Sequence, residues 1–200
     1  MTTRDTYDIE TYEREPQMEV IRTDAKDAKP TNWNMAASLM MIDVVQMAKH
    51  PSFSSSDGGG LLQERIQNHF DQIVDGVFHS EMPANDATLE KQFLIICAYG
   101  LNGYAAELKI SVEEAGIQVL DTIIGKQRMY GHGNIARFAI PGIAIRLNDK
   151  LERLKNLQKH DGPVLFEPIN DTWLDICGYS VIALLWMRGW FMLELEPEVK

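Results

Sequence analysis

The chain has 200 residues, which is the size of one ordinary domain and enough to bury a hydrophobic core without disulfides or structural metals. Apolar residues make up 45% and charged residues 24% of the sequence, which is typical of a folded globular protein and excludes a wholly disordered or collagenous chain. The net charge of −10 disfavours partners such as nucleic acid polymers and anionic membranes. A nucleotide stays compatible with this charge when a divalent cation bridges phosphate and carboxylate.

The two cysteines, Cys97 and Cys177, lie inside apolar runs, which is typical of reduced core thiols rather than of a disulfide framework or a zinc site. The N-terminal sequence MTTRDTYDIETYERE lacks the apolar segment of a signal peptide and is too acidic for a transit peptide. The most apolar stretch, residues 181–195, contains Arg188 and Glu194 and is too short and too charged to span a bilayer. We therefore expect a cytoplasmic protein in a reducing setting.

The first 60 residues contain three segments that differ in composition and periodicity. Residues 1–31 carry many charges without helical or strand periodicity, so we expect a flexible or surface-laid arm. Residues 34–50 repeat apolar side chains at helical spacing and predict the first helix. The following sequence PSFSSSDGGG, residues 51–60, has the composition of a flexible linker.

Two more helices are predicted before the middle of the chain. Apolar stripes at helical spacing indicate helices over residues 61–78 and 88–108. Gly100 and Gly103 lie inside the second of these, where they predict a kink or a break. With the first helix they form an N-terminal helical region over residues 32–110.

The clearest helix start in the sequence is Ser111 followed by Glu114, which predicts a capping box and a helix over residues 112–130. The next sequence, GHGNIARFAI at residues 131–140, predicts a loop. It contains the dinucleotide-binding pattern GxGxxA, but a helix precedes it where that fold requires a strand. We therefore set a dinucleotide fold aside.

The C-terminal part of the chain predicts two long helices. Pro141 is placed at a first helical position, and the apolar stripe after it ends before the sequence HDGP. A final helix is expected over residues 168–192, and it is apolar on almost every face in its second half. No alternating strand or internal repeat is found, so the sequence predicts an all-α bundle of about six helices, with residues 111–200 as its C-terminal core.

An acidic row marks the start of the final helix. Glu167, Asp171 and Asp175 recur at every fourth residue and therefore share one helix face. The same face continues with Gly178 and Ile182, which are core types, so we expect the row to point into the bundle. Because like charges repel, a hard divalent cation with oxygen ligands is the usual compensation. The alternative is a solvated first turn whose acids suit the helix dipole.

The preceding helix carries charged residues opposite its apolar stripe, a pattern that taken alone indicates a solvated face. If this face closes over the acidic row, Asp149 and Glu152 join the metal ligands. Lys150, Arg153 and Arg146 are then available to hold phosphate oxygens. Mg²⁺, with Mn²⁺ as an alternative, suits such a site, and a water acidified by the ion is a nucleophile for phosphoanhydride hydrolysis.

The runs KQRMYGHGNIARFAIPGIAIRLNDKLERLKNL and EPINDTWLDICGYSVIALL resemble the phage-type "nucleotide modification associated" branch of the MazG-like all-α NTP pyrophosphatases. The resemblance covers residues 126–185 and implies a rearranged four-helix bundle that binds Mg²⁺ through acids on two adjacent helices. It further implies hydrolysis of a nucleoside triphosphate to monophosphate and pyrophosphate, in the host cytoplasm if the protein is phage-encoded. The superfamily pattern is ExxE followed by ExxD, whereas this sequence has DxxE followed by ExxxDxxxD.

The residues and the resemblance together nominate a site. The catalytic and metal-binding acids are Asp149, Glu167, Asp171 and Asp175, with Glu152 as a further metal ligand. The substrate-binding residues are Lys126, Tyr130, Arg146, Lys150 and Arg153.

Three functions compete on this sequence. The leading expectation is a Mg²⁺-dependent nucleotide pyrophosphohydrolase, and the alternative is a catalytically silent helical module that binds a nucleotide or a host protein. A purely structural assembly protein is supported only by the apolar final helix. We expect a homo-oligomer, in the first place a dimer, because that helix is apolar over more of its circumference than one neighbour can cover, and the resembled superfamily is generally oligomeric. The alternative is that the N-terminal helices cover it within one chain.

Overall fold

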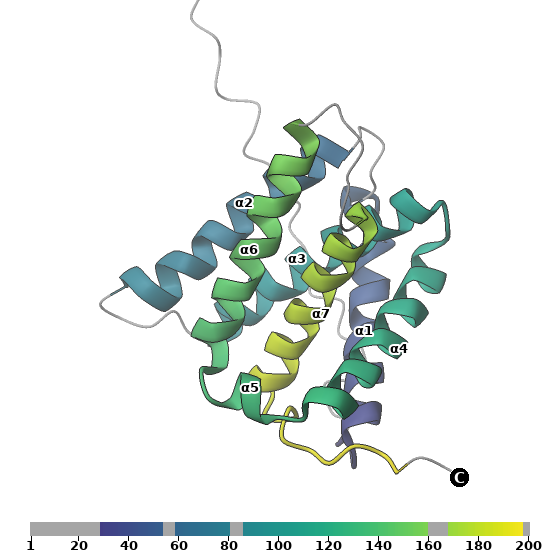
Figure 1. The fold of residues 1–200 in the computed structure, drawn as a ribbon, viewed down its shortest axis with the longest axis vertical. Coiled ribbons are helices and arrows are strands. Elements are labelled where there is room, and N and C mark those ends of the chain that lie inside the picture. The colour runs from purple at the N-terminus through teal and green to yellow at the C-terminus, as the bar shows by residue number, and fades with distance from the viewer. Residues whose placement is uncertain (1–28, 54–58, 81–85, 160–167, 198–200) are drawn as a thin grey trace, which may run out of the picture.

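The computed structural model describes residues 29–53, 59–80, 86–159 and 168–197, and within these ranges the chain is helical and contains no strand (Figure 1). The all-α prediction is therefore confirmed for this part of the chain. The helices, with the short 3-10 helix η3 and the short π-helix η4 between them, are α1 Trp33–Ala48, η3 Pro51–Phe53, α2 Gly59–Val74, η4 Asp75–His79, α3 Asp86–Leu108, α4 Val112–Tyr130, α5 Gly133–Ala136, α6 Ala139–Lys159 and α7 Ile169–Met187. None of these helices is long and apolar enough to cross a membrane.

Helix α7 forms the centre of the bundle. It lies between α6 and α4 (Figure 1), and it packs most extensively on α3 and then on α6, with α1 and α4 completing its surroundings. Residues on several of its faces are buried, among them Trp173, Ile176 and Leu185, as expected for a helix that is apolar almost all round. Because α1 and α3 cover α7 within one chain, its apolar surface no longer argues for a dimer. Self-association stays a prediction.

Helix α3 runs without interruption through Gly100 and Gly103, so the predicted break is absent. These glycines instead allow α3 to approach α7. A Cβ atom at Gly103 would lie 2.7 Å from the Trp173 ring, and one at Gly100 would lie 3.1 Å from the Cys177 sulfur. The missing side chains thus bring the two most extensively packed helices close together.

The ends of the C-terminal helices follow local chemistry. The capping box at Ser111 is confirmed, because its hydroxyl accepts a hydrogen bond from the Glu114 amide while the Glu114 carboxylate accepts one from the Ser111 amide. Helix α7 ends at Met187, earlier than predicted, because Gly189 adopts a left-handed conformation (φ 70°) that stops the helix. The Trp190 amide then closes this end with a 2.8 Å hydrogen bond to the Leu185 carbonyl.

Two predicted irregular segments contain helix. In the predicted linker, Phe53 of η3 is buried with its ring 4.6 Å from that of Tyr99, and the last glycines begin α2. In the predicted loop, α5 forms a short helix, and α6 begins at Ala139, so Pro141 is its third residue rather than its first. Proline is tolerated there because the first-turn amides of a helix lack intrahelical acceptors.

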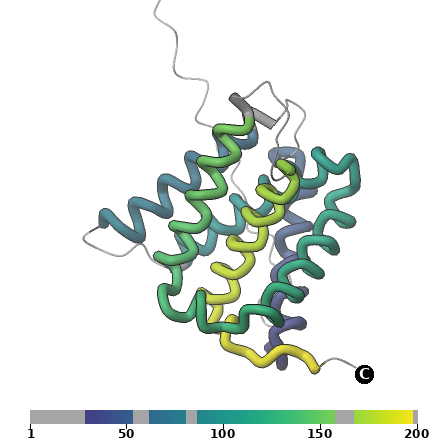
Figure 2. Tube along the Cα trace, viewed as in Figure 1, coloured from purple at the N-terminus to yellow at the C-terminus, as the bar shows by residue number. Residues whose placement is uncertain are grey.

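The segment after α7 crosses one end of the bundle and passes the start of α1 (Figure 2). The Trp33 amide donates to the Glu194 carbonyl at 2.8 Å, and the Glu196 amide donates to Asn34 Oδ1 at 3.2 Å. These bonds hold the end of the described chain against α1. The predicted arm, residues 1–31, lies almost entirely outside the described residues.

Candidate functional site

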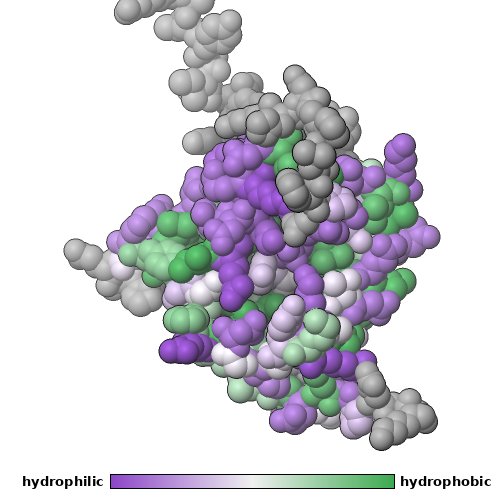
Figure 3. All heavy atoms as spheres, in the orientation of Figure 1, coloured by the Kyte–Doolittle hydropathy of each residue, from purple (hydrophilic) through white to green (hydrophobic). Residues whose placement is uncertain are grey.

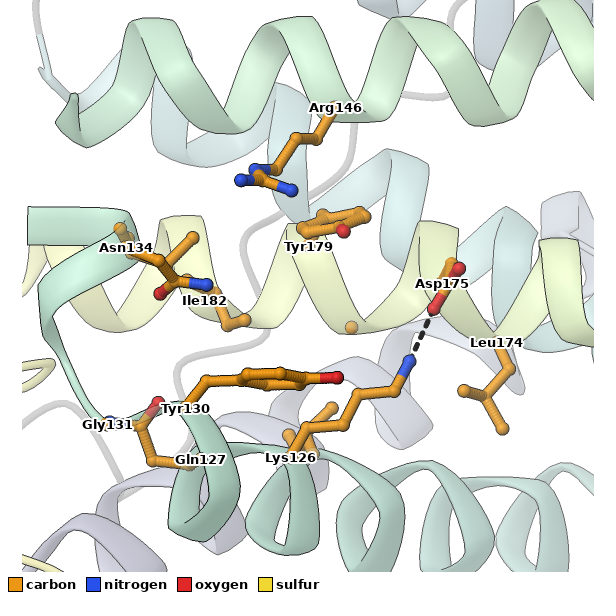
Figure 4. A pocket seen from close by; sticks show the side chains of 13 residues that line it. Lys126, Gln127, Tyr130, Gly131, Asn134, Arg146, Leu174, Asp175, Tyr179 and Ile182 are labelled. Carbon is orange, nitrogen blue, oxygen red and sulfur yellow. Dashed lines mark hydrogen bonds and ion pairs between the residues drawn. The ribbon is translucent and has the colours of Figure 1, made fainter. Parts of the chain in front are cut away.

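A cavity of about 410 Å³ opens between α4, α5, α6 and α7 (Figure 4). Its walls include Lys126 and Tyr130 from α4, Arg146 from α6, and Asp175 and Tyr179 from α7. This volume lies within the range of about 300–1,000 Å³ that is typical of small-molecule sites. The face between α6 and α4 carries a mixture of hydrophilic and weakly hydrophobic side chains rather than one continuous apolar patch (Figure 3). We call this cavity the pocket.

One end of the pocket is ionic and is centred on Asp175. The Lys126 Nζ atom lies 2.6 Å from Asp175 Oδ1, the contact dashed in Figure 4, and the Lys150 Nζ atom lies 2.8 Å from Oδ2. Burial alone raises the pKa of this carboxyl group, but the hydrogen bonds from the two lysines outweigh burial and hold the pKa below its ordinary value. We call Lys126, Lys150 and Asp175 the lysine–aspartate cluster. Lys126 and Asp175 line the pocket, whereas Lys150 contacts Asp175 without being part of the pocket wall. One acid between two cations carries a net positive charge, to which Arg146 at the pocket wall adds.

The described acids of the predicted row, Asp171 and Asp175, lie in different environments. Asp175 is turned into the bundle as expected, with 19% of its side chain exposed, but the charges that compensate it are ammonium groups. Asp171 is exposed and does not line the pocket. Glu167 lies outside the described residues.

The remaining nominated residues of α6 lie outside the pocket. Asp149 and Glu152 are exposed, as the solvated-face alternative expects, and Glu152 forms a 2.7 Å ion pair with Lys155 on the same helix. Arg153 is half-buried and is not part of the pocket wall. In the described ranges, no three histidine, cysteine or acidic side chains gather closely enough to hold a metal ion.

The opposite end of the pocket is formed by amide side chains. Gln127 and Asn134 lie there near Gly131 and Ile182, away from Asp175 (Figure 4). Gln127 is only 5% exposed, and its Nε2 atom has no hydrogen-bond partner among the described residues. An unsatisfied buried donor costs about 1–3 kcal/mol of folding free energy. The pocket therefore carries an amide with unused hydrogen-bonding capacity.

Sequence reasoning missed both Gln127 and Asn134. For Gln127 a signal exists, because Val119, Ile123 and Gln127 recur at every fourth residue and all are buried, which makes the glutamine a polar residue in an apolar stripe. Asn134 offers no comparable signal, since it lies in the segment that was predicted to be a loop.

No family model matches the chain, and neither the curated proteins nor the solved structures contain a match.

Proposed function

We propose that the pocket binds a nucleoside triphosphate or a related nucleotide and that the protein hydrolyses it to monophosphate and pyrophosphate with Mg²⁺. One observation carries the proposal. Lys126, Tyr130, Arg146 and Asp175, which were nominated from the sequence, come from three helices and line the same cavity. Independent nomination and shared geometry make this cavity the best candidate for the site.

The charges of the pocket suit a phosphate chain. Lys126 presents an ammonium group at its ionic end, where the Lys150 ammonium group is also paired with Asp175. Arg146 adds a guanidinium whose planar fork matches phosphate oxygens. Tyr130 and Tyr179 add aromatic rings to the wall, which suit contact with a sugar or a base. The overall charge of −10 does not oppose this, because the local charge of the pocket is positive.

The donor set fits Mg²⁺ that arrives with a nucleotide better than Mg²⁺ held by the protein alone. Mg²⁺ is usually bound by one or two carboxylates together with substrate phosphates and water. Asp175 lines the pocket and is the acid that would hold the ion, whereas Asp171, one helical turn earlier on α7, is exposed outside the pocket. When bound, the ion supplies an acidified water for attack on a phosphoanhydride. When the nucleotide binds, the ammonium groups of Lys126 and Lys150 exchange Asp175 for the phosphates as their partner.

A second candidate function is nucleotide binding without turnover. Both Asp175 oxygens are engaged by lysines, and no group of three or more potential ligands is found in the described part of the chain. On this alternative the lysine–aspartate cluster binds the phosphates and no metal enters.

The test is a panel of nucleoside triphosphates incubated with the purified protein, with and without Mg²⁺ or Mn²⁺. Binding is measured by calorimetry, and chromatography resolves monophosphate, diphosphate, phosphate and pyrophosphate. Metal-dependent monophosphate and pyrophosphate support the hydrolase. Binding without products supports the second candidate, and the absence of both binding and products contradicts both proposals.

A further inference from the structure

We infer that Gln127 recognises the base of the bound nucleotide, so that its amide is the group in the pocket that selects a heterocycle. The inference rests on the proposed nucleotide binding and deepens it. Its basis is the buried Nε2 atom of Gln127, which lacks a partner among the described residues and takes no part in the proposed phosphate binding.

The two ends of the pocket differ in chemistry and lie apart. At one end Lys126 meets Asp175, and at the other end lies the amide of Gln127, with the side chain of Tyr130 extending between them (Figure 4). Phosphates belong at the ionic end because the ammonium groups are there. A nucleotide in that orientation directs its base toward Gln127 and Asn134.

The amide of Gln127 has the right chemistry for a base edge. A glutamine side chain offers one donor group and one acceptor side by side, and this pair matches the adjacent acceptor and donor on the edge of a nucleobase. Nε2 is the unsatisfied atom, so the ligand must supply an acceptor, such as a carbonyl oxygen or a ring nitrogen. A phosphate chain without a base offers acceptors but no donor edge to pair with the amide as a base does.

Gln92 provides a matched control on α3. It is buried to a similar degree, at 6% exposure, but its amide is satisfied on both sides. Its Oε1 atom lies 2.7 Å from His69 Nδ1, and its Nε2 atom donates to Gln72 Oε1 at 2.7 Å. Gln92 does not line the pocket. The two glutamines therefore differ in whether the protein itself completes their hydrogen bonds.

The experiment compares wild type, Gln127→Met and Gln92→Met by calorimetric titration in EDTA, where hydrolysis is blocked. The ligands are nucleoside triphosphates and inorganic tripolyphosphate, which has no base. Gln127→Met is expected to weaken binding of at least one triphosphate about tenfold and to leave tripolyphosphate unchanged. Gln92→Met should leave both affinities unchanged.

Thermal melting of the unliganded proteins supplies a readout that a structural role would not produce. Gln127→Met should raise the melting temperature because it removes an unsatisfied buried donor, whereas Gln92→Met should lower it. Gln127→Leu repeats the test with a second apolar side chain. Equal loss of both ligands, no loss of any nucleotide, or a lower melting temperature in both Gln127 variants would overturn the inference.

The two proposals fail differently. If wild type binds no nucleotide, the proposed function fails and the base-recognition role fails with it. If wild type binds nucleotides and the Gln127 variants bind them equally well, only the role of Gln127 fails.

Discussion

Two ionic clusters in this protein have opposite composition and occupy different places in the bundle. At the end of α7, Arg188 lies between two acids, with Glu90 at 2.8 Å and Asp43 at 3.5 Å. In the pocket, Asp175 lies between two lysines. One cation between two acids carries a net charge of −1, whereas one acid between two cations carries +1.

The difference in burial separates a structural cluster from a ligand site. The Arg188 side chain is 13% exposed, stacks over the Trp190 ring at 5.3 Å and ties α7 to α1 and α3 without lining the pocket. Lys126, in contrast, is 47% exposed at the rim of a cavity. A buried arginine with acids around it holds helices together, whereas an exposed lysine at the rim of a cavity can exchange its carboxylate for an anionic ligand.

The largest effect is expected when the cluster of Arg188, Asp43 and Glu90 is broken. Arg188→Met leaves Asp43 and Glu90 without their shared cation, so we expect the free energy of unfolding to fall by about 3 kcal/mol in urea titrations. Nucleotide affinity measured under native conditions should not change. A loss of stability below about 1 kcal/mol, or a loss of nucleotide binding in the folded variant, would contradict the structural assignment of this cluster.

The second effect removes one cation from the lysine–aspartate cluster. Lys150→Met should weaken nucleotide binding about tenfold, because one charge beside Asp175 is lost. Lys155→Met on the same helix is the matched control, since Lys155 pairs with Glu152 rather than with Asp175. Calorimetric titration of the two variants in parallel checks this, and equal affinities would place the phosphates elsewhere.

The smallest effect concerns Asp175. If Asp175 belonged only to a row of like charges, Asp175→Asn would leave the fold intact or more stable, because it would relieve repulsion within the row. Since both of its oxygens face lysines, we now expect the substitution to lower the free energy of unfolding by about 1 kcal/mol at neutral pH. Asp121→Asn, at an exposed position on α4, should be silent.

The pH dependence of that loss has a definite sign. The pKa of Asp175 is lower in the folded protein than in the unfolded chain, so its stabilisation is present above the unfolded pKa of about 3.9. The stabilisation is lost as pH falls through the folded pKa. Unfolding of wild type and Asp175→Asn measured across acidic pH should therefore converge, and a difference that grows with acidity would contradict the lysine pairing.

Asp175→Asn also separates the two proposed functions. It releases both ammonium groups from Asp175, so metal-free nucleotide binding should tighten, while Mg²⁺-dependent hydrolysis should be abolished if Asp175 holds the ion. A variant that hydrolyses as fast as wild type would remove Asp175 from the metal site.

The sequence predicted features that depend on neighbours along one helix. The Ser111 capping box and the apolar character of α7 are local patterns, and both are confirmed. The roles of Gly100 and Gly103 depend on contact with α7, which spacing within α3 cannot reveal. Phe53 likewise belongs to the core because of the Tyr99 ring, although its neighbours have the composition of a linker.

In the site, too, features set along one helix could be predicted, whereas features set by contacts between helices could not. Lys126, Tyr130, Arg146 and Asp175 were nominated from helix faces and from the family resemblance, and all line one pocket. That the partners of Asp175 are lysines depends on how α4 and α6 flank α7, which spacing along each helix does not determine. The unsatisfied amide of Gln127 could not be predicted either, because it depends on which atoms surround that side chain.

The central claim is that the ionic end of the pocket binds the phosphates of a nucleotide, and a metal-free calorimetric titration tests it most directly. Wild type and the double variant Lys126→Met/Lys150→Met are titrated with the nucleoside triphosphate that wild type binds most tightly. The account predicts binding by wild type and a loss of about 100-fold in the folded double variant. Absence of binding to any nucleoside triphosphate by wild type, or equal affinity of the two proteins, would contradict it.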